Sequence, residues 1–550
     1  MDTLTNRTFP DLLNRSLTRF ADFSALSLVD GEALTYRDLA VASQSVSQRL
    51  RTLGVEKGDR VALVGENMPN WAVVYLATTT MGAVIVPILP DFSATEIRNI
   101  LDHAKAKVVF VSRMLSEKIG HVGDRVAVTL NDFQGLPEPR PKDTVDDGIG
   151  EQIADAPPVA EDDLAAIIYT SGTTGQSKGV MLSHANIISN AEAARPLADA
   201  NPGECALSIL PLAHTYECTI GLIAPLSAGM TVYYLGRQPS PSAMLTALAK
   251  VRPHLVLSVP MIIEKIYRSR IVPKLTRNAL LRAVQKLSPV RKAFHRAAGK
   301  RLLETFGGRL RFFGLGGAPI GPDVEKFLQE ARFPYGVGYG LTETSPLIAS
   351  GVPAAQVYRG VGPAVEGVEI RLADTNPVTG EGEIQVRGPN VMKGYYRDSQ
   401  RTDAAFTDDG WFRTGDLGFI DRNNRLFVKG RLKNVIVEPS GKNIYPEELE
   451  ALINTRPLIS ESLVVKQGQR LVALVAVELD ALREQLGEIT YDRVKREAAA
   501  YLERVRSEIN AQLSSFAQIS RFVLQEEPFE KTPTMKIKRY RYDQIVENGR

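Results

Sequence analysis

Residues 35–66 read TYRDLAVASQSVSQRLRTLGVEKGDRVALVGE, and this segment indicates the class of fold. Its first part repeats apolar residues at helical spacing and stops at Gly54, whereas RVALVGE at 60–66 is the apolar run of a buried strand. Residues 71–89, and then SATEIRNILDHAKA and KVVFVS, repeat this helix–strand order. The alternation predicts doubly wound α/β subdomains, in which helices cover both faces of a largely parallel sheet.

The character of the sequence changes after Gly360. VEIRLAD, GEIQVRG, GWFRTGDLGFID and RLFVKG are short strand patterns separated by turn residues, and they predict a small β unit. Beyond Arg431, Pro446 opens a helix pattern that carries Glu447 and Glu448 in its first turn. The strand pattern LVALVAVEL and the charged helix pattern YDRVKREAAAYLERVRSEINAQL follow. The C-terminal segment therefore predicts a small α+β domain.

The chain of 550 residues has the composition of an ordinary globular protein. It is 44% hydrophobic and 23% charged, and its 66 Lys and Arg residues nearly balance 63 Asp and Glu residues. These values exclude fibrous and disordered architectures and argue against a general nucleic-acid binder. The two cysteines, Cys205 and Cys218, cannot form a disulfide framework, and no histidine has metal-ligand spacing. We therefore expect a reducing compartment and no protein-ligated transition metal.

Two uncharged stretches, residues 71–90 and 218–236, are long enough to be considered as membrane spans. Gly82 interrupts the first, and Pro225 and Gly229 interrupt the second, after which each continues as a β-branched or aromatic run. This pattern favours a buried helix followed by a buried strand. The N-terminus, MDTLTNRTFPDLLNRSL, lacks the apolar core of a secretory signal. The expected location is cytoplasmic.

The strongest local signal is YTSGTTGQSKGVMLSH, residues 169–184, which directly follows the apolar strand pattern LAAIIY. Loops that leave strand ends in α/β sheets bind ligands, so we expect a loop here. Hydroxyl side chains, glycines and one lysine are what a polyphosphate cradle requires; here they are Ser171, Gly172, Thr173, Thr174, Gly175, Lys178 and Gly179.

Two better-known phosphate motifs are absent from the sequence. The cradle is not a Walker A loop, because Lys178 is followed by glycine and not by serine or threonine. The string GLGGAPIG, residues 314–321, is not the dinucleotide fingerprint, because Pro319 stands where the third glycine belongs.

The string YTSGTTGQSKGV resembles the signature of the adenylate-forming enzymes, which include acyl-CoA synthetases, firefly-type luciferases and the adenylation domains of peptide synthetases. The resemblance covers essentially the whole chain, because further matches follow in the family's order: LPLAHTYE (210–217), GLGGAPI (314–320), YGLTETSP (339–346), GWFRTGDLG (410–418), GRLKNVIVEPSGKNIYPEE (430–448) and KTPTMKIKR (531–539). SGKNIYPEE together with TPTMKIKR is most similar to the long-chain fatty acyl-CoA synthetase branch.

The resemblance implies two half-reactions that use ATP, Mg²⁺ and coenzyme A. A carboxylate attacks the α-phosphate of ATP to give an acyl-adenylate and pyrophosphate, and the thiol of CoA then displaces AMP. It also implies an N-terminal adenylation domain at 1–430, which binds ATP and the acyl group, a hinge at 431–433 with Lys433 at its centre, and a small mobile C-terminal lid domain at 434–550. Domain motion would separate the two steps.

The resemblance further implies roles for single residues. Glu343, helped by Thr170, would bind Mg²⁺, and Thr342 would hydrogen-bond the α-phosphate. Tyr339 would stack on adenine, and Asp416 would accept hydrogen bonds from the ribose hydroxyls. Other residues would complete the nucleotide site, border the acyl pocket or meet CoA: Arg431, Gly316, Gly317, Ala318 and Gly340 at the nucleotide, His214 at the acyl pocket, and Gly441 and Lys442 at CoA.

Lys536 would bridge the attacking carboxylate and the α-phosphate, which brings two anions together. Without the resemblance, nothing distinguishes Lys536 from the other lysines of KTPTMKIKR. Two positions depart from the family pattern. Asn434 follows Lys433 where many relatives carry aspartate, and Met535 stands before Lys536 where many carry glycine, so the backbone of that loop is more restricted here.

Residues 265–301 contain 12 basic residues and no acidic one, interleaved with apolar side chains. Such a stretch either rests on anionic lipid, at the inner face of a membrane, or forms a solvated helical face, and the sequence leaves both open. The partners implied are a carboxylic acid, most simply a fatty acid, with ATP and CoA. The alternatives are a ligase that passes the acyl group from its adenylate to a carrier protein, an aryl or medium-chain acid–CoA ligase, and an inactive scaffold that keeps the fold.

Overall fold

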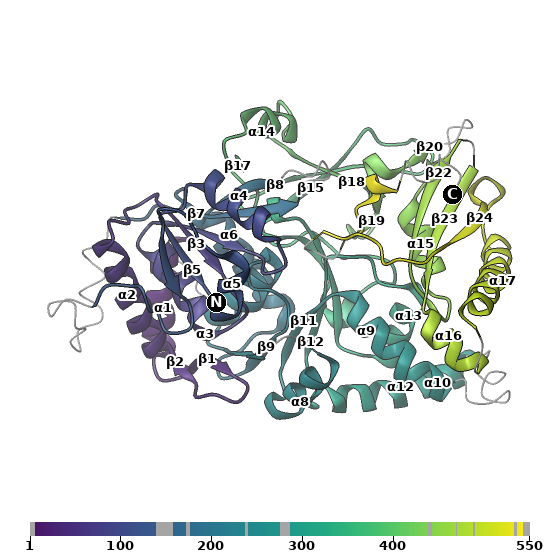
Figure 1. Cartoon of the computed structure of the whole chain (residues 1–550), viewed down its shortest axis with the longest axis horizontal. Coiled ribbons are helices and arrows are strands. Elements are labelled where there is room, and N and C mark those ends of the chain that lie inside the picture. Colours follow the sequence, from purple (N-terminus) through teal and green to yellow (C-terminus); the bar gives the residue numbers. More distant parts are fainter. Residues whose placement is uncertain are drawn as a thin grey trace.

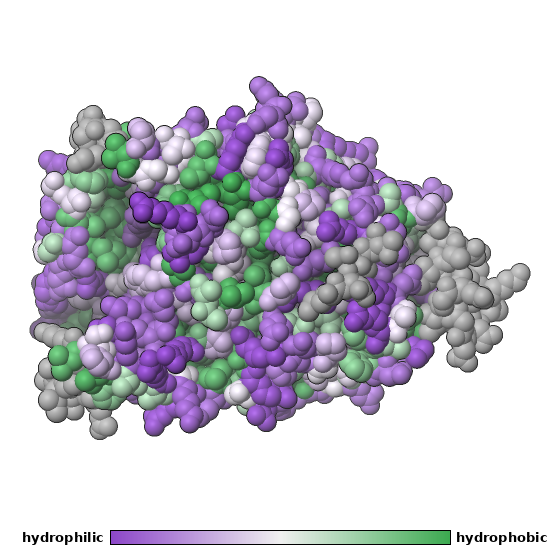
Figure 2. All heavy atoms as spheres, turned by 180° about the vertical axis from the view of Figure 1, so that it is seen from behind, coloured by the Kyte–Doolittle hydropathy of each residue, from purple (hydrophilic) through white to green (hydrophobic). Residues whose placement is uncertain are grey.

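Figure 1 shows the computed structural model of the chain, with its N-terminal part on one side and its C-terminal part on the other. It describes residues 6–138, 158–171, 177–236, 240–275, 287–437, 443–468, 470–487, 490–532 and 536–542, and only the backbone of Ser171 and Pro241. Viewed from behind, the surface is mostly polar with scattered apolar patches (Figure 2). Such a surface is ordinary for a globular protein.

A seven-stranded sheet has the order β17-β8-β7-β4-β3-β5-β6. The strands from β7 to β6 are parallel, and at one edge β8 pairs antiparallel with both β7 and β17. The strands are β3 (Arg60–Val64), β4 (Val84–Ile88), β5 (Val108–Val111), β6 (Val126–Thr129), β7 (Leu164–Ser171), β8 (Ser177–Ser183) and β17 (Gly394–Tyr395). The helices nearest to them in the chain are α1 (Phe9–Phe20), α2 (Tyr36–Thr52), α3 (Pro69–Thr80), α4 (Ala94–Ala104), α5 (Arg113–Ile119), α6 (His184–Ala198) and α14 (Ser399–Ala405).

An eight-stranded sheet has the order β14-β13-β12-β11-β9-β10-β1-β2, parallel except at its two edges. Its strands are β1 (Ser24–Leu28), β2 (Leu34–Thr35), β9 (Cys205–Ser208), β10 (Thr231–Tyr234), β11 (Leu255–Ser258), β12 (Phe312–Leu315), β13 (Tyr335–Gly340) and β14 (Leu347–Ser350). The helices between them are the π-helices η3 (Tyr216–Ile223) and η4 (Tyr267–Ile271), with α7 (Ala224–Ser227), α8 (Pro241–Val251), α9 (Pro260–Ile266), α10 (Val272–Leu275), α12 (Ser288–Thr305) and α13 (Pro322–Ala331). Both sheets confirm the predicted α/β class.

Local signals explain the helix ends. The Thr35 hydroxyl accepts the backbone N–H of Asp38, and the Asp38 carboxylate accepts the backbone N–H of Thr35. This capping box stabilises the start of α2. Gly54 follows its end with φ +75°. A second capping box, Ser93 with Glu96, starts α4. These elements therefore form where the sequence predicts them.

The two stretches considered as membrane spans fold as predicted. Residues 71–80 lie in the buried helix α3, Gly82 turns the chain with φ +80°, and β4 is buried along its whole length. The second stretch contains η3, α7 and β10, with Gly229 at φ +78°. Among the described residues, no helix combines the length and the apolar character needed to cross a bilayer.

The segment 169–184 departs from its prediction as a loop. β7 continues to Ser171 and pairs antiparallel with β8, so the segment is a hairpin whose tip, residues 172–176, lies outside the described residues. The hairpin forms because apolar residues flank its tip on both sides and pair as two strands. In this register Thr170 lies opposite Lys178 and Tyr169 lies opposite Gly179. Thr170 and Lys178 are thus fixed side by side on rigid strands.

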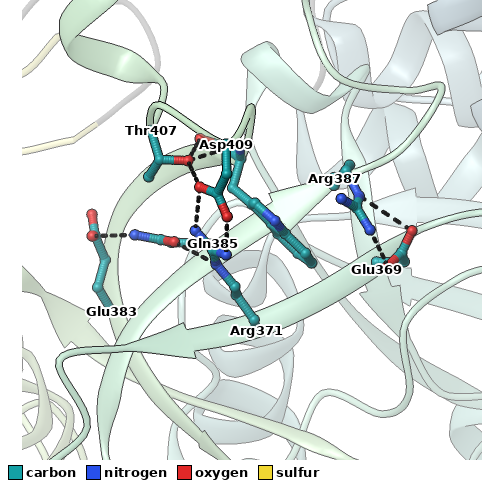
Figure 3. A network of polar contacts seen from close by, with 8 residues as sticks. Glu369, Arg371, Glu383, Gln385, Arg387, Thr407 and Asp409 are labelled. Atoms are coloured by element: carbon teal, nitrogen blue, oxygen red, sulfur yellow. Dashed lines mark hydrogen bonds and ion pairs between the residues drawn. The ribbon is translucent and has the colours of Figure 1, made fainter.

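The predicted β unit is a four-stranded antiparallel sheet, β15-β16-β18-β19. Its strands are β15 (Glu369–Ala373), β16 (Gly382–Arg387), β18 (Phe412–Ile420) and β19 (Leu426–Arg431). Figure 3 shows polar contacts that tie the sheet to the turn before β18, such as the Arg371–Asp409 ion pair at 2.5 Å. Arg371 and Arg387 flank the Trp411 ring at 4.5 and 4.6 Å from its centroid.

The C-terminal part carries a three-stranded sheet, β22-β23-β24, and a two-stranded ribbon, β20-β21. Its elements are β20 (Ile436–Val437), β21 (Asn443–Ile444), α15 (Pro446–Ile453), β22 (Ile459–Gln467), β23 (Arg470–Val477), α16 (Leu479–Leu486), α17 (Tyr491–Asn510) and β24 (Ile519–Gln525). Its described residues form three apolar clusters of their own. The predicted α15, β23 and α17 are confirmed, and the domain boundaries at 430 and 434 stay a prediction.

Candidate active site

Glu343 lies at the centre of the first group of polar side chains. It sits in the short 3-10 helix η5 (Thr342–Thr344) after β13. Lys178 of β8 places its Nζ 2.6 Å from Glu343 Oε1 and 2.7 Å from the hydroxyl of Tyr395, and that hydroxyl donates to the same Oε1 at 2.9 Å. Burial would raise the pKa of Glu343, but the Lys178 charge and these hydrogen bonds hold it below its ordinary value. The buried carboxylate is therefore ionised at neutral pH.

This group gives one expected residue a partner within the protein and adds one residue that was not predicted. Lys178, expected at a phosphate, pairs here with the predicted metal ligand Glu343. Tyr395 was not predicted; it lies in β17, which pairs with β8, and no motif in the sequence marks it. Thr170, opposite Lys178 in the hairpin, has a buried hydroxyl with no hydrogen-bond partner among the described residues.

These donors suit a magnesium ion. Mg²⁺ commonly takes one or two carboxylates and completes its shell with water and substrate phosphates. The ionised carboxylate of Glu343 and the unpartnered hydroxyl of Thr170 fit that requirement. Within the described ranges, no cluster of three or more His, Cys, Asp or Glu residues could hold a metal through protein ligands alone.

Asp416 forms the second group, with Tyr339 and Arg431. Asp416 and Arg431 are directly opposite each other on β18 and β19, which explains the 2.9 Å ion pair between Arg431 Nε and Asp416 Oδ1. The Tyr339 hydroxyl, from the end of β13, donates to Asp416 Oδ2 at 2.7 Å. Burial raises the pKa of Asp416, while the Arg431 charge and the Tyr339 hydrogen bond act against that rise.

Asp416 keeps acceptor capacity for a ligand. A carboxylate offers about four lone-pair positions, and these two partners use one on each oxygen. The arrangement is thus compatible with the predicted ribose contact. Tyr339 is held by its hydroxyl to Asp416, so its ring orientation is fixed before any ligand arrives.

Lys536, in the C-terminal part, lies near these two groups of polar side chains. In Figure 1 the yellow end of the chain runs from that part toward the middle of the molecule. Lys536 is accessible to solvent, yet its pKa is lowered, first by desolvation and then by the charge of Arg431. The charges of Asp416 and Glu343 act on it in the opposite direction. Lys536 therefore lies within range of the charges of both carboxylates.

His214 stands just before η3, partly buried, and its Nδ1 accepts the backbone N–H of Tyr216 at 3.2 Å. Desolvation, and then the charge of Lys536, lower its pKa to about 4, so the imidazole is neutral at pH 7. The Tyr216 ring packs on Gly316, where a Cβ atom would come within 3.1 Å of the ring. Gly316 thus makes room for Tyr216 as well as for any ligand.

The structure describes some of the remaining predicted residues and leaves others outside its described ranges. Gly317 adopts φ +82° and, like Ala318, is exposed after β12. Gly340 tolerates no side chain, because a Cβ atom there would lie 1.7 Å from the carbonyl oxygen of Pro346. Thr342 opens η5 directly before Glu343. Gly172, Thr173, Thr174, Gly175, Gly441, Lys442 and Met535 lie outside the described residues, as does the Ser171 side chain.

The predicted hinge forms a 3-10 turn, η7 (Leu432–Asn434), between β19 and β20. Lys433 is exposed at the surface, and desolvation by its surroundings, followed by the Arg431 charge, lowers its pKa. Asn434, at the position where many relatives carry aspartate, donates from its amide to Glu447 Oε1 at 2.6 Å. An uncharged side chain here can bond α15, whereas an aspartate would repel Glu447.

Comparison with known proteins matches this chain to AMP-binding enzymes, by family model, by sequence and by structure. Residues 13–396 match the family model described as AMP-binding enzyme. The chain is 31% identical to the long-chain-fatty-acid–CoA ligase FadD15 of Mycobacterium bovis, covering 93% of this chain and 91% of that protein. It is also 31% identical to 4-coumarate–CoA ligase 3 of Oryza sativa subsp. japonica, covering 85% and 81%. The crystal structure of ATP-bound MatB from Rhodopseudomonas palustris is similar with a TM-score of 0.76 and 26% identity, covering 98% and 99%.

Proposed function

We propose that this chain, which belongs to the AMP-binding enzyme family and to its acid–CoA ligases, is an ATP-dependent fatty acyl-CoA synthetase. In the first step a carboxylate oxygen attacks the α-phosphorus of ATP, and the bond from that phosphorus to the bridging oxygen breaks to release pyrophosphate. In the second step the CoA sulfur attacks the acyl carbon, and the acyl–oxygen bond breaks to release AMP. The thiol proton goes to solvent.

One observation carries this proposal: Lys536, from a separate part of the chain, lies within range of the charges of Glu343 and Asp416. Both reactants of the first step are anions, so their approach needs cations more than it needs a covalent catalyst. Lys536 would hold the carboxylate against the α-phosphate. Arg431, fixed by Asp416, would supply a second positive charge beside the ribose or phosphate.

The other residues would bind and orient ATP. Asp416 would accept the ribose hydroxyls, the tethered ring of Tyr339 would lie against adenine, and Thr342 would bond the α-phosphate. Glu343 and Thr170 would hold Mg²⁺, which when bound neutralises charge on the phosphates. The cradle residues at 171–175 and Lys178 would surround the outer phosphates, with Lys178 exchanging Glu343 for a phosphate oxygen.

We propose a long-chain fatty acid as the substrate, with coenzyme A as the acceptor. The support is the 31% identity to a long-chain-fatty-acid–CoA ligase over nearly the whole chain. The equal identity to a 4-coumarate–CoA ligase, over a shorter part of the chain, keeps an aryl acid as the second candidate. Transfer of the acyl group to a carrier protein is the third.

The test is carboxylate-dependent exchange of labelled pyrophosphate into ATP, with fatty acids of graded chain length and 4-coumarate as separate arms. Exchange that peaks with long-chain acids, followed by acyl-CoA formation when CoA is added, is the expected result. A peak with 4-coumarate would overturn the fatty acid assignment. Acyl transfer to a carrier protein but not to CoA would overturn the acceptor.

We also propose a cytoplasmic enzyme that meets anionic membrane through part of residues 265–301. Leu287 and Phe294 are 60% and 37% exposed, and Lys292 and Arg296 are exposed on α12. Arg291 is engaged with Glu330 at 2.7 Å and so contributes less. Pelleting with vesicles of phosphatidylcholine, with and without phosphatidylserine, tests this contact. Equal pelleting with both kinds of vesicle would overturn the proposed contact with anionic lipid.

A further inference from the structure

Helix α15 (Pro446–Ile453) connects the C-terminal part to the N-terminal part at both of its ends. At its start, the Tyr445 hydroxyl donates to Glu381 Oε2 at 2.6 Å, and Glu448 pairs with Lys429 at 3.0 Å. Both partners lie beside or within the four-stranded sheet, next to the hinge. These contacts are expected near any hinge, because the two parts are covalently joined there.

The other end of α15 is held by a residue far away in the sequence. Arg268, in the π-helix η4, donates from Nη1 to the backbone carbonyl of Asn454, which caps the C-terminus of α15. The last carbonyls of a helix lack partners within the helix and form the negative end of its dipole. A guanidinium is therefore well suited to hold this end. In Figure 1, α9 and α13 lie on the same side as α15.

Further charged side chains lie near this contact. Asp323, in the first turn of α13, experiences the charges of both Arg268 and Arg456, and burial raises its pKa. Asp323 Oδ1 and Arg456 Nε are buried and have no hydrogen-bond partner among the described residues. Arg456 follows α15 by three residues. The contact thus places two arginines, one from each part, within range of the charge of one half-buried aspartate.

The contact is linked to Lys536 through α15. Glu450 of α15 is buried and accepts the Val464 N–H on Oε1 at 2.7 Å and the Arg539 guanidinium on Oε2. Arg539 follows Lys536 by three residues. A displacement of α15 would therefore displace the segment that carries Lys536.

We propose that Arg268 is a positioning residue for adenylate formation: by capping α15, it holds the C-terminal part where Lys536 meets ATP and the acid. This inference rests on the proposed function. It also assigns one arginine of the basic segment 265–301 to a contact within the molecule. Arg268 touches no reacting atom, so its removal weakens only the step that uses Lys536.

The test compares Arg268→Ala with wild type in each half-reaction separately. We expect the rate of carboxylate-dependent pyrophosphate exchange to fall about tenfold, the usual effect of losing one charge-assisted hydrogen bond. Thioester formation from supplied acyl-adenylate and CoA should remain at the wild-type rate. Arg270→Ala removes the same charge from an exposed site two residues away, and it should change neither half-reaction.

Arg268→Lys should recover part of the exchange rate, because an ammonium can still donate to the Asn454 carbonyl. Unchanged exchange in Arg268→Ala, or equal loss in both half-reactions, would overturn the inference. If Arg268→Ala does not fold, as judged by thermal unfolding, Arg268→Gln with Arg268→Lys provides the same comparison. Failure of the proposed function is distinct, because wild type itself would then show no exchange.

Discussion

Glu343 and Asp416 are buried and bonded directly within the N-terminal part, whereas Lys536 is exposed and comes from the C-terminal part. Lys178 lies 2.6 Å from Glu343, and Arg431 lies 2.9 Å from Asp416. The Lys536 ammonium has no hydrogen-bond partner in the described part of the chain, and its place depends on contacts made by α15. The two carboxylates are thus held in place within the N-terminal part, whereas the position of Lys536 depends on how the C-terminal part is placed.

This difference separates two kinds of effect. Changes around Glu343 and Asp416 should alter the binding of ATP and magnesium, because those groups are fixed before substrates arrive. Changes at Lys536, or at its supports, should alter the rate of one half-reaction and leave nucleotide binding nearly intact.

The largest effect is expected from Lys536→Ala. Loss of the cation that holds two anions together should slow adenylate formation about 10²- to 10³-fold. Thiolysis of supplied acyl-adenylate should be nearly unchanged, which rapid-quench assays of each half-reaction can measure. Lys538→Ala is the matched control, because Lys538 pairs with Glu530 at 2.6 Å. Equal loss in both half-reactions would contradict a role of Lys536 in adenylate formation alone.

Asp416→Asn should act on binding. The amide is a poorer acceptor for the ribose hydroxyls and leaves Arg431 without its buried partner, so the KM for ATP should rise about 10- to 100-fold. Tyr339→Phe, which removes only the donor to Asp416, should give a smaller rise. Steady-state kinetics at saturating acid measures both. A fall in kcat with no change in KM would oppose a role in binding.

Lys178→Met should change the pH profile. The pKa of Glu343 is lowered in wild type, so its carboxylate stays ionised well into the acidic range. Without the Lys178 charge, burial should raise that pKa, and the acidic limb of kcat/KM should move to higher pH. Activity at pH 7 should fall about tenfold. Excess Mg²⁺ should restore part of it, and an unmoved acidic limb would refute the pairing.

Glu217 shows what a buried carboxyl does without a cation beside it. It is 1% exposed in η3, and burial, opposed only by a hydrogen bond from Ser208, raises its pKa to about 8. The folded protein therefore holds a proton that the unfolded chain releases above about pH 4.5, and stability falls as pH rises from there to 8. Glu217→Gln should reduce that fall by a few degrees in Tm. Parallel Tm–pH curves for variant and wild type would contradict the shift.

The sequence predicted the elements that depend on neighbouring residues. The capping box of Thr35 and Asp38 and the apolar run of β3 are local signals, and both elements formed as expected. The pairing of Lys178 with Glu343 joins residues 165 positions apart, and the Arg268–Asn454 contact joins residues 186 apart. No local pattern encodes such contacts, and Lys536 was chosen by family resemblance alone.

The most direct test of the account uses a fatty acid labelled with ¹⁸O in its carboxyl group, together with ATP, Mg²⁺ and CoA. Attack of the carboxylate on the α-phosphorus, followed by thiolysis of the acyl–oxygen bond, leaves one carboxyl oxygen on AMP. Mass spectrometry should therefore find one ¹⁸O in the AMP released for each acyl-CoA formed. Unlabelled AMP, or label in inorganic phosphate or pyrophosphate, would contradict activation through an acyl-adenylate.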